Sequence, residues 1–338
     1  MHVSDGVIDA IGNTPLIRLP RLSTAIGREI YAKAEHLNPG GSIKDRAAKY
    51  MVLEAEKDGR LKPGGTIVEG TAGNTGIGLA MVALARGYKA LIVMPNNQAA
   101  EKYTYLHALR AELVTVPPTK FADQAHFYHT ARRLAEERNA RGESAFWADQ
   151  FENEANARAH YATTGPEIWR AMDGRVDALV LSSGTGGTIG GTSRYLKEQD
   201  ARVRVVLADP AGSGLYSFVK RGEWKSEGSS ITEGIGIMRS TANFRQGKID
   251  DALFVSDQKM IDMAHWLLAH EGLFVGTSAA LNVWAAATVA RGLPAGARVV
   301  TFICDGGQRY QSRVFDEAWL KEKGLTPKAT ELDAILAA

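Results

Sequence analysis

Short apolar runs rich in β-branched residues alternate with longer stretches of helical periodicity along most of this chain. Such alternation is typical of parallel strands joined by helices that cover both faces of a sheet, and it predicts an α/β protein. The predicted strands span residues 29–35, 66–69, 90–94, 113–116, 178–182, 203–208, 253–255 and 299–303. The clearest predicted helices span 42–57, 74–86, 123–138 and 257–270.

Length and composition narrow the class of protein. The chain has 338 residues, enough for two lobes, with 45% hydrophobic and 23% charged residues, as in an average globular protein. A net charge of +2 is too small to indicate a positively charged surface that binds nucleic acid. Small-molecule partners are therefore favoured.

Neither a secretory signal nor a membrane span is expected. The N-terminus lacks a basic segment followed by an apolar one, and apolar runs such as 281–290 are too short to cross a bilayer. A cytoplasmic protein is predicted. The single cysteine, Cys304, suits a reducing compartment, and its apolar surroundings favour a buried structural thiol over a nucleophile.

The glycine-rich segment 182–191 follows a predicted strand and opens a helix. Its backbone N–H groups could converge on one anion, so it is a candidate phosphate site formed by Gly184, Thr185, Gly186, Gly187 and Thr188. Two alternatives remain open. It could be a plain strand-to-helix turn, or part of a dinucleotide site with Asp209, although Ile189 stands where the third glycine of that fingerprint belongs.

Two further turns place polar groups at helix starts. Thr71, Asn74 and Thr75 lie where free N–H groups could bind a carboxylate or a phenolic oxygen, although an ordinary N-cap at Thr71 or Asn74 is the alternative. In segment 271–282, Ser278 could cap a helix or offer its hydroxyl to a ligand nitrogen.

Lys44 follows an Asn-Pro-Gly-Gly loop, in the first turn of a predicted helix. Most lysines are solvated surface charges. The positive end of a helix, however, favours the neutral amine that can attack an aldehyde.

The motifs NPGGSIKDR, TAGNTG and GTGGT occur in that order, together with IGNTPLIRL, SSITEGIG and CDGGQRYQS. In this combination the chain closely resembles the cysteine synthase and cystathionine β-synthase family of fold type II pyridoxal phosphate enzymes, from about Ile11 to Leu325. The resemblance implies two open, mostly parallel sheets flanked by helices, as in the tryptophan synthase β fold, with the cofactor between two domains. It assigns 38–153 to a smaller domain, 16–37 plus 154–325 to a larger one, and 326–338 to a peripheral tail.

The resemblance also implies roles for single residues. Lys44 would carry pyridoxal 5'-phosphate as an internal aldimine, Asn74 would contact its O3' oxygen, residues 184–188 would hold its phosphate, and Ser278 would face its pyridine nitrogen. A neutral hydroxyl at that nitrogen suits elimination better than full carbanion chemistry. No metal is expected. The implied substrate contacts are Thr71, Ala72, Gly73, Thr75 and Gln150.

The implied reaction is replacement at the β-carbon of an activated serine, typically O-acetylserine. Lys44 would remove the α-proton, acetate would leave, and the bound aminoacrylate would accept sulfide to give cysteine. The family further implies a homodimer and permits serine acetyltransferase as a partner.

Departures from the family pattern keep other activities open. Ala72 replaces a serine and Ala280 a glycine, which leaves the donor and the nucleophile undecided. Thr75 after Asn74 favours replacement over the deamination of serine or threonine, since those lyases usually carry histidine there. Cystathionine formation, a nucleotide-dependent oxidoreductase and a non-catalytic relative are the remaining alternatives.

Overall fold

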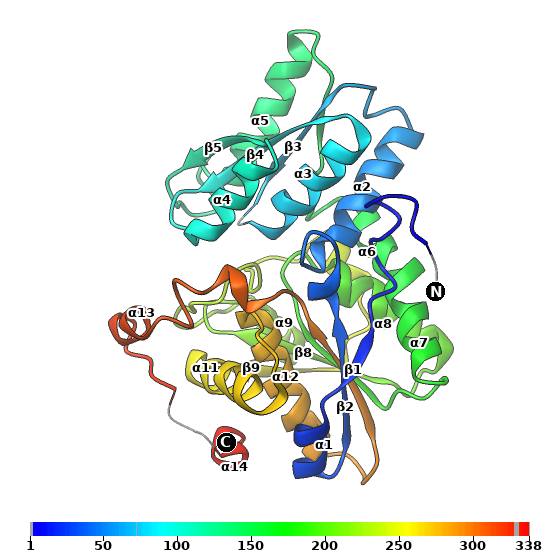
Figure 1. Cartoon of the computed structure of the whole chain (residues 1–338), viewed down its shortest axis with the longest axis vertical. Coiled ribbons are helices and arrows are strands. Elements are labelled where there is room, and N and C mark those ends of the chain that lie inside the picture. The colour runs from blue at the N-terminus through cyan, green and yellow to red at the C-terminus, as the bar shows by residue number, and fades with distance from the viewer. Residues whose placement is uncertain (1–2, 72, 328–330, 338) are drawn as a thin grey trace.

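The computed structural model describes residues 3–71, 73–327 and 331–337, which form a six-stranded and a four-stranded sheet flanked by helices. The smaller sheet lies above the larger one in Figure 1. The strands are β1 (Leu16–Arg18), β2 (Glu29–Ala34), β3 (Thr66–Gly70), β4 (Lys89–Pro95), β5 (Glu112–Val116), β6 (Ala145–Trp147), β7 (Ala178–Ser182), β8 (Arg204–Pro210), β9 (Asp251–Val255) and β10 (Arg298–Ile303).

Most helices lie between strands in the sequence, and the last two follow β10. The helices are α1 (Pro20–Ile26), α2 (Lys44–Lys57), α3 (Asn74–Arg86), α4 (Ala100–Ala108), α5 (Phe127–Ala140), α6 (Ala155–Ala159), α7 (Gly165–Ala171), α8 (Gly187–Gln199), α9 (Leu215–Arg221), α10 (Ala242–Arg245), α11 (Asp257–Trp266), α12 (Thr277–Arg291), α13 (Glu317–Glu322) and α14 (Leu332–Ile335). Short 3₁₀ segments are η1 (Glu35–Leu37) and η4 (Gly307–Arg309), and π segments are η2 (His160–Thr164) and η3 (Leu267–Glu271).

The larger sheet has the order β1-β2-β10-β7-β8-β9, and only β1 pairs antiparallel. Its central strands are buried on both faces, so side chains of alternate parity enter two cores. Val180 belongs to the core under α11 and α12, whereas Leu179 and Leu181 belong to the core under α7 and α8. This explains why the central strands appear in the sequence as continuous apolar runs.

The smaller sheet is fully parallel, in the order β5-β4-β3-β6. Ile67 and Ile92 pack with α2, α3 and α4 on one face, and Val68 and Leu91 pack with α5 on the other. Its strands fall within residues 66–147, and those of the larger sheet come from both sides of that interval.

The predicted α/β class with two mostly parallel sheets is confirmed, and differences are confined to ends and short elements. The helix predicted over 123–138 begins only at Phe127, because Asp123 instead accepts the N–H of Ala125 within a turn. The helix predicted over 257–270 changes to a π segment at Leu267, and the one predicted from 42 begins at Lys44. β1 and β6 lie outside the predicted strands, since three residues give too short a pattern to detect.

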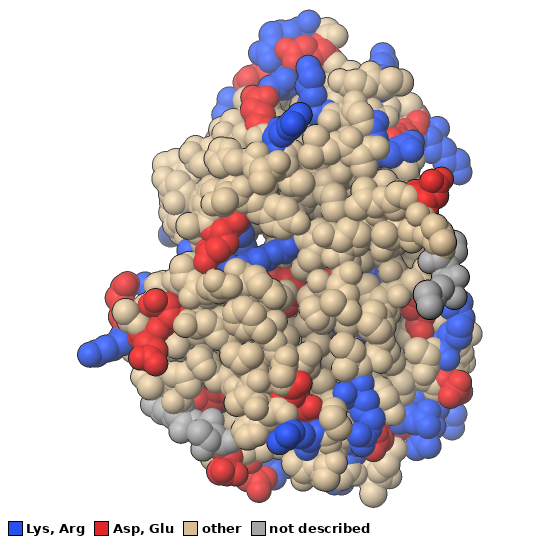
Figure 2. All heavy atoms as spheres, in the orientation of Figure 1, with Lys and Arg blue, Asp and Glu red and all other residues tan. Residues whose placement is uncertain are grey.

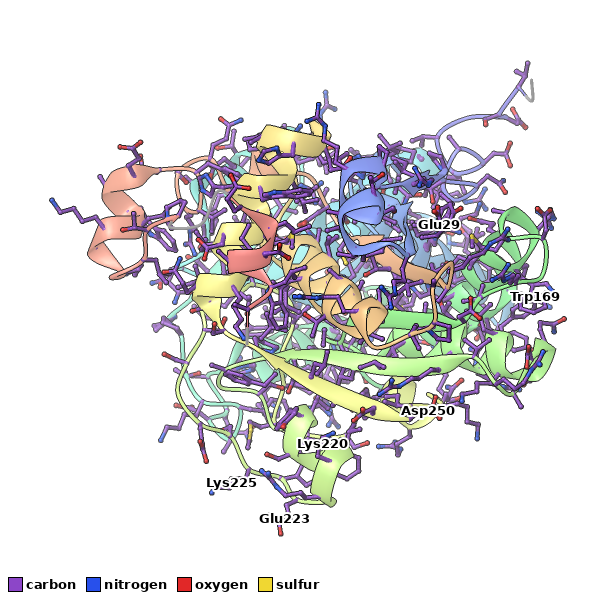
Figure 3. All side chains as sticks on the ribbon, turned by 90° about the horizontal axis from the view of Figure 1, so that it is seen from below. Glu29, Trp169, Lys220, Glu223, Lys225 and Asp250 are labelled. Carbon is purple, nitrogen blue, oxygen red and sulfur yellow. The ribbon has the colours of Figure 1, made fainter. Side chains whose placement is uncertain are left out.

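Charged residues surround the start of edge strand β9. Asp251 pairs with Lys220 at 2.6 Å and with Arg204 at 2.9 Å, and Asp250 pairs with Lys197 at 2.7 Å. Figure 3 shows Lys220 and Asp250 on this side of the molecule. Charges of this kind disfavour pairing of an exposed strand with another chain.

The described part of the tail is anchored to the larger domain. Leu332, Ile335 and Leu336 are buried in its core, and the indole N–H of Trp284 donates to the Ile335 carbonyl at 2.8 Å. The tail therefore lies at the edge of the domain but completes the cover over α12.

No helix within the described ranges is both long and apolar enough to cross a membrane.

Replacing Ile335 with alanine should lower the free energy of unfolding by about 2–4 kcal/mol, because a buried aliphatic side chain is lost from the core. The measurement is the midpoint of chemical denaturation. Asp333→Ala, an exposed position of the same helix, is the control and should change stability little. Equal effects of the two substitutions would show that the tail is not part of the core.

Candidate active site

A cleft opens between the two sheets, at the carboxyl ends of β3 and β7. Figure 2 shows the hollow between the two halves of the molecule, with charged side chains at its mouth. Ligands of open parallel sheets bind at such edges. The cleft brings together most of the predicted site residues, namely Lys44, Thr71, Gly73, Asn74, Thr75, Gln150, Gly184, Thr185, Gly186, Thr188 and Ser278. Gly187 is buried beside it, and Ala72 lies outside the described residues.

Lys44 is the first residue of α2, and it lines the cleft. Burial among protein atoms lowers the pKa of its amine, against the opposing effect of Cys304 and Asp305. The preceding loop is held in place because the Ile43 N–H donates to the Cys304 carbonyl at 2.9 Å. The amine is thus biased toward the neutral, nucleophilic form that the sequence prediction requires.

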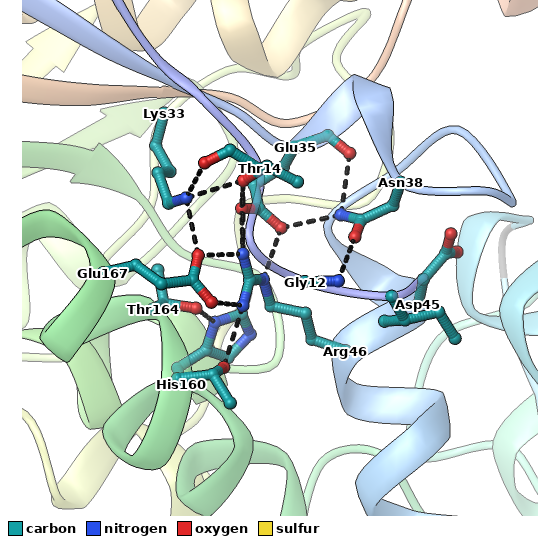
Figure 4. Close-up of polar contacts among 12 residues, drawn as sticks. Gly12, Thr14, Lys33, Glu35, Asn38, Asp45, Arg46, His160, Thr164 and Glu167 are labelled. Atoms are coloured by element: carbon teal, nitrogen blue, oxygen red, sulfur yellow. Dashed lines mark hydrogen bonds and ion pairs between the residues drawn. The ribbon is translucent and has the colours of Figure 1, made fainter. Parts of the chain in front are cut away.

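The first turn of α2 is fixed by a buried ion network. Arg46, 1% exposed, donates to both oxygens of Glu35 at 2.8 and 2.9 Å and to both oxygens of Glu167 at 2.7 Å (Figure 4). Lys33 on β2 adds a contact to Glu167 at 2.6 Å. Burial alone would raise the pKa of Glu35, but Arg46 outweighs that effect and holds it at about 2. Two cations and two carboxylates therefore compensate one another and join α2 to the larger domain.

The turn that leads into α3 at Asn74, here called the asparagine turn, leaves the N-terminus of that helix without a side-chain cap. Gly73 is the N-cap, with φ at 143°, and no side chain caps the helix, so the alternative of an ordinary cap at Thr71 or Asn74 is wrong. Thr71 Oγ1 instead accepts the N–H of Gly73 at 3.1 Å. Free N–H groups and the positive end of the helix dipole therefore face the cleft.

Thr75 in the first turn of α3 is joined to Gln150, which follows β6. The Thr75 hydroxyl donates to Gln150 Oε1 at 2.5 Å, and Gln150 Nε2 donates to Glu69 Oε1 at 3.0 Å. Burial and the neighbouring Asp149 raise the pKa of Glu69 well above its usual range. This chain of contacts sets both predicted carboxylate-binding side chains in one place.

The predicted phosphate site is built as a close-packed cup at the start of α8. Gly186 is the N-cap, with φ at 89°, and a Cβ on Gly184 would lie 2.1 Å from the Gly234 carbonyl oxygen. Asn156 Nδ2 donates to Thr185 Oγ1 at 2.9 Å, and Thr241 Oγ1 donates to the Thr185 carbonyl at 2.7 Å. A glycine-rich cup at a helix N-terminus, with threonine hydroxyls on either side of its glycines, fits a phosphate group.

Asn156 and Thr241, which support this cup, were not singled out by sequence reasoning. A Cβ on Gly187 would lie 1.9 Å from Asn156 Oδ1, so the third glycine of the cup serves packing. Asp209, the acidic residue of the dinucleotide alternative, instead accepts the N–H of Tyr216 at 2.7 Å and is fully buried. The geometry therefore does not support a ribose-binding role for it.

Ser278 lies in the first turn of α12 and lines the cleft together with Cys304, whose thiol accepts a hydrogen bond from Asn282 Nδ2 at 3.4 Å. Burial raises the pKa of that thiol to about 11, although the Lys44 amine opposes the shift. Cys304 is therefore protonated and no nucleophile, as predicted, but it lines the cleft rather than only filling a core. The apolar run around it in the sequence carried no sign of this position.

A pair of opposite charges that the sequence did not reveal closes one side of the cleft. Lys102 on α4 pairs with Glu233 of the larger domain, and Arg313 contacts the other Glu233 oxygen at 2.5 Å. Lys102 is 2% exposed, whereas a lysine in a polar helix is normally expected at the surface. Glu233 lies within the SSITEGIG motif, which was its only signal.

The donor set of this cleft fits an aldehyde-bearing, phosphorylated ligand. It provides an amine of lowered pKa, an anion cup, an amide and a hydroxyl. Across residues 3–71, 73–327 and 331–337, no three His, Cys, Asp or Glu side chains gather where they could hold a metal ion.

Comparisons with known proteins agree with this chemistry. The model of a family described as "Pyridoxal-phosphate dependent enzyme" matches residues 7–305. Cysteine synthase 1 of Neurospora crassa is 52% identical over 328 residues, which cover 96% of this chain and 86% of that protein.

Two solved structures are similar over nearly the whole chain. O-acetylserine-dependent cystathionine β-synthase from Helicobacter pylori has a TM-score of 0.84 at 35% identity, covering 93% of this chain and 99% of that one. O-ureido-L-serine synthase has a TM-score of 0.83 at 35% identity, covering 95% and 100%.

Replacing Glu35 with glutamine should lower the free energy of unfolding by about 3–5 kcal/mol at pH 7, because Arg46 then loses a buried counter-charge. The pKa of Glu35 is depressed on folding from 4.5 to about 2, so its contribution is complete above pH 4.5 and declines as the pH falls toward 2. The difference between the variant and the parent protein should shrink in that window.

The measurement is denaturation followed from pH 7 to pH 3. Glu29→Gln, which removes one partner of the exposed Arg18–Glu29 pair, is the control and should change little. A pH-independent difference would contradict the assignment of charge to Glu35.

Proposed function

Because the chain belongs to the family of pyridoxal-phosphate dependent enzymes, we propose that it replaces the β-substituent of O-acetyl-L-serine with sulfide, giving L-cysteine and acetate. The observation that carries this proposal is the convergence of Lys44, the asparagine turn and the phosphate cup on one cleft. The cysteine synthase of Neurospora crassa, similar over nearly the whole chain, supports the choice of reaction.

The residues fit the cofactor in a defined arrangement. We assign its aldehyde to Lys44, its phosphate to residues 184–188, its phenolic oxygen to Asn74 and its pyridine nitrogen to Ser278. When bound, the cofactor withdraws electrons from the α-carbon of the amino acid. The Ser278 hydroxyl is neutral, which limits this withdrawal and suits elimination from the β-carbon.

Lys44 and the asparagine turn have different roles toward the substrate. The Lys44 amine would serve as the base for the α-proton, a role that its lowered pKa favours near neutral pH. We assign the substrate carboxylate to Thr71, Gly73, Thr75 and Gln150, which line the same part of the cleft. The N-terminus of α3, which is the positive end of the helix dipole, favours the negative charge of the carboxylate.

Another activated serine or another nucleophile is the second candidate. The Helicobacter pylori structure is named for a cystathionine-forming enzyme that depends on O-acetylserine, and the other neighbour for the synthesis of O-ureido-L-serine. The test is to supply O-acetylserine with sulfide, homocysteine or no nucleophile, and to compare cysteine, cystathionine and pyruvate formation. The fastest product selects the activity, and pyruvate without a nucleophile would select a deaminating lyase.

We further propose that the enzyme is a cytoplasmic homodimer and that it can associate with serine acetyltransferase. The support is the resemblance to cysteine synthases. Light scattering of the purified protein, alone and with serine acetyltransferase, tests both assemblies.

Lys44→Ala should abolish covalent attachment of the cofactor and lower kcat by at least about a hundredfold, because both the anchor and the base are lost. Borohydride reduction followed by peptide mass spectrometry locates the attachment. Lys57→Ala, an exposed lysine at the other end of α2, is the control and should keep both properties. Cofactor found on another lysine of the parent protein would refute the assignment.

Gly184→Ala should weaken cofactor binding at least about tenfold, because its Cβ would displace the Gly234 backbone and distort the cup. The dissociation constant is measured by titrating apoprotein with pyridoxal phosphate. Gly292→Ala, where φ is −85° and the nearest atom is 3.5 Å away, is the matched control. Unchanged binding in Gly184→Ala would place the phosphate elsewhere.

A further inference from the structure

Both polar atoms of the Asn74 side chain have partners from the far end of the sequence. Arg309 Nη1 donates to Asn74 Oδ1 at 2.5 Å, and Asn74 Nδ2 donates to Asp305 Oδ2 at 2.7 Å. These contacts join α3 of the smaller domain to the segment that follows β10 in the larger one.

The two partners permit only one orientation of the amide. A guanidinium group donates and never accepts, and an ionised carboxylate accepts and never donates. If the Asn74 amide flipped, its NH₂ group would face Arg309 and its oxygen would face Asp305, and both contacts would become repulsive. The chemistry of the neighbours therefore fixes which side of the amide carries the NH₂ group.

Arg309 and Asp305 are themselves held in place. They are 8% and 1% exposed, and Tyr310 donates its hydroxyl to Asp305 Oδ2 at 2.7 Å. Arg309 Nη2 also donates to the Gly40 carbonyl in the loop that leads to Lys44. One guanidinium thus contacts both the asparagine turn and the lysine loop.

The functional consequence of this fixed orientation concerns the second N–H of the Asn74 amide. A primary amide has two N–H donors, and Asp305 accepts only one from Asn74. We propose that Arg309 and Asp305 are positioning residues that keep the NH₂ group of Asn74 turned toward the cofactor's phenolic oxygen. This inference rests on the proposed function, in which Asn74 contacts that oxygen.

A double-mutant cycle separates positioning from a general structural role. The cycle uses apoproteins of three single variants, Asn74→Ala, Arg309→Met and Asp305→Ala. It also uses two double variants, in which Arg309→Met or Asp305→Ala is combined with Asn74→Ala. Each is titrated with pyridoxal phosphate, and the dissociation constant and the absorbance spectrum of the bound cofactor are recorded. Arg309→Lys keeps a donor and provides a folded variant if Arg309→Met does not fold.

If the proposal is right, Arg309→Met and Asp305→Ala weaken cofactor binding at least about tenfold and shift the spectrum as Asn74→Ala does. In the Asn74→Ala background their effects on the dissociation constant should be smaller, because only the contacts with the lysine loop and the Lys44 amine then remain. Arg309→Lys should restore part of the parent spectrum, since it can still donate to the amide oxygen.

The control is Arg28→Met. Arg28 donates to the Leu293 and Ile26 carbonyls away from the cleft, so its loss should lower stability and leave the cofactor spectrum unchanged. If Arg309→Met changed the dissociation constant and the spectrum as much in the Asn74→Ala background as in the parent protein, the positioning role would be wrong. The proposed contact of Asn74 with the cofactor would be unaffected. If Asn74→Ala changed neither affinity nor spectrum, the Asn74 contact of the proposed function would be wrong, and the inference with it.

Discussion

The buried pairing of Arg46 with Glu35 and Glu167 is the interaction on which the arrangement of the site depends. Removing these charges from water is costly, and the cost is offset only when each guanidinium edge meets a carboxylate, as it does here. Because Arg46 lies two residues after Lys44, this requirement also fixes the start of α2. The position of the reactive amine is thus set by an ion network that does not line the cleft.

Helix N-termini provide the electrostatic character of the cleft. The first turns of α2, α3, α8 and α12 all contribute residues to it. Parallel topology brings these ends together, since the connections that lead from parallel strands into helices lie on the same edge of each sheet. The positive ends of their dipoles favour anionic groups, as the proposed binding of a phosphate and a carboxylate requires.

Local pattern was sufficient to predict much of the fold. Buried strands such as Ala178–Ser182 are recognisable because a short apolar run bounded by turns is too brief to form a helix. Ala145–Trp147 escaped prediction because three residues carry no period. The start of α5 was misplaced because the side chain of Asp123 bonds locally in a turn, a competition that composition does not reveal.

The residues of the site fall into the same two groups, those that a local pattern predicts and those that it does not. Lys44, Asn74 and the cup residues lie in short motifs whose chemistry is readable in sequence. Arg309 lies in the CDGGQRYQS motif and Lys102 in none, but the role of neither is readable there, because both roles arise only when distant segments meet. Arg309 contacts Gly40 across 269 positions, and Lys102 contacts Glu233 across 131. No periodicity or local motif encodes such distances.

These long-range contacts have a further consequence for how the molecule is built. Asn74 contacts Asp305 across the cleft, so the bonds that pack the two domains together are also the bonds that orient the site. A cleft made in this way does not exist in either domain alone. Cofactor binding and domain packing are therefore linked thermodynamically, since a ligand that binds only the packed arrangement stabilises it in proportion to its affinity.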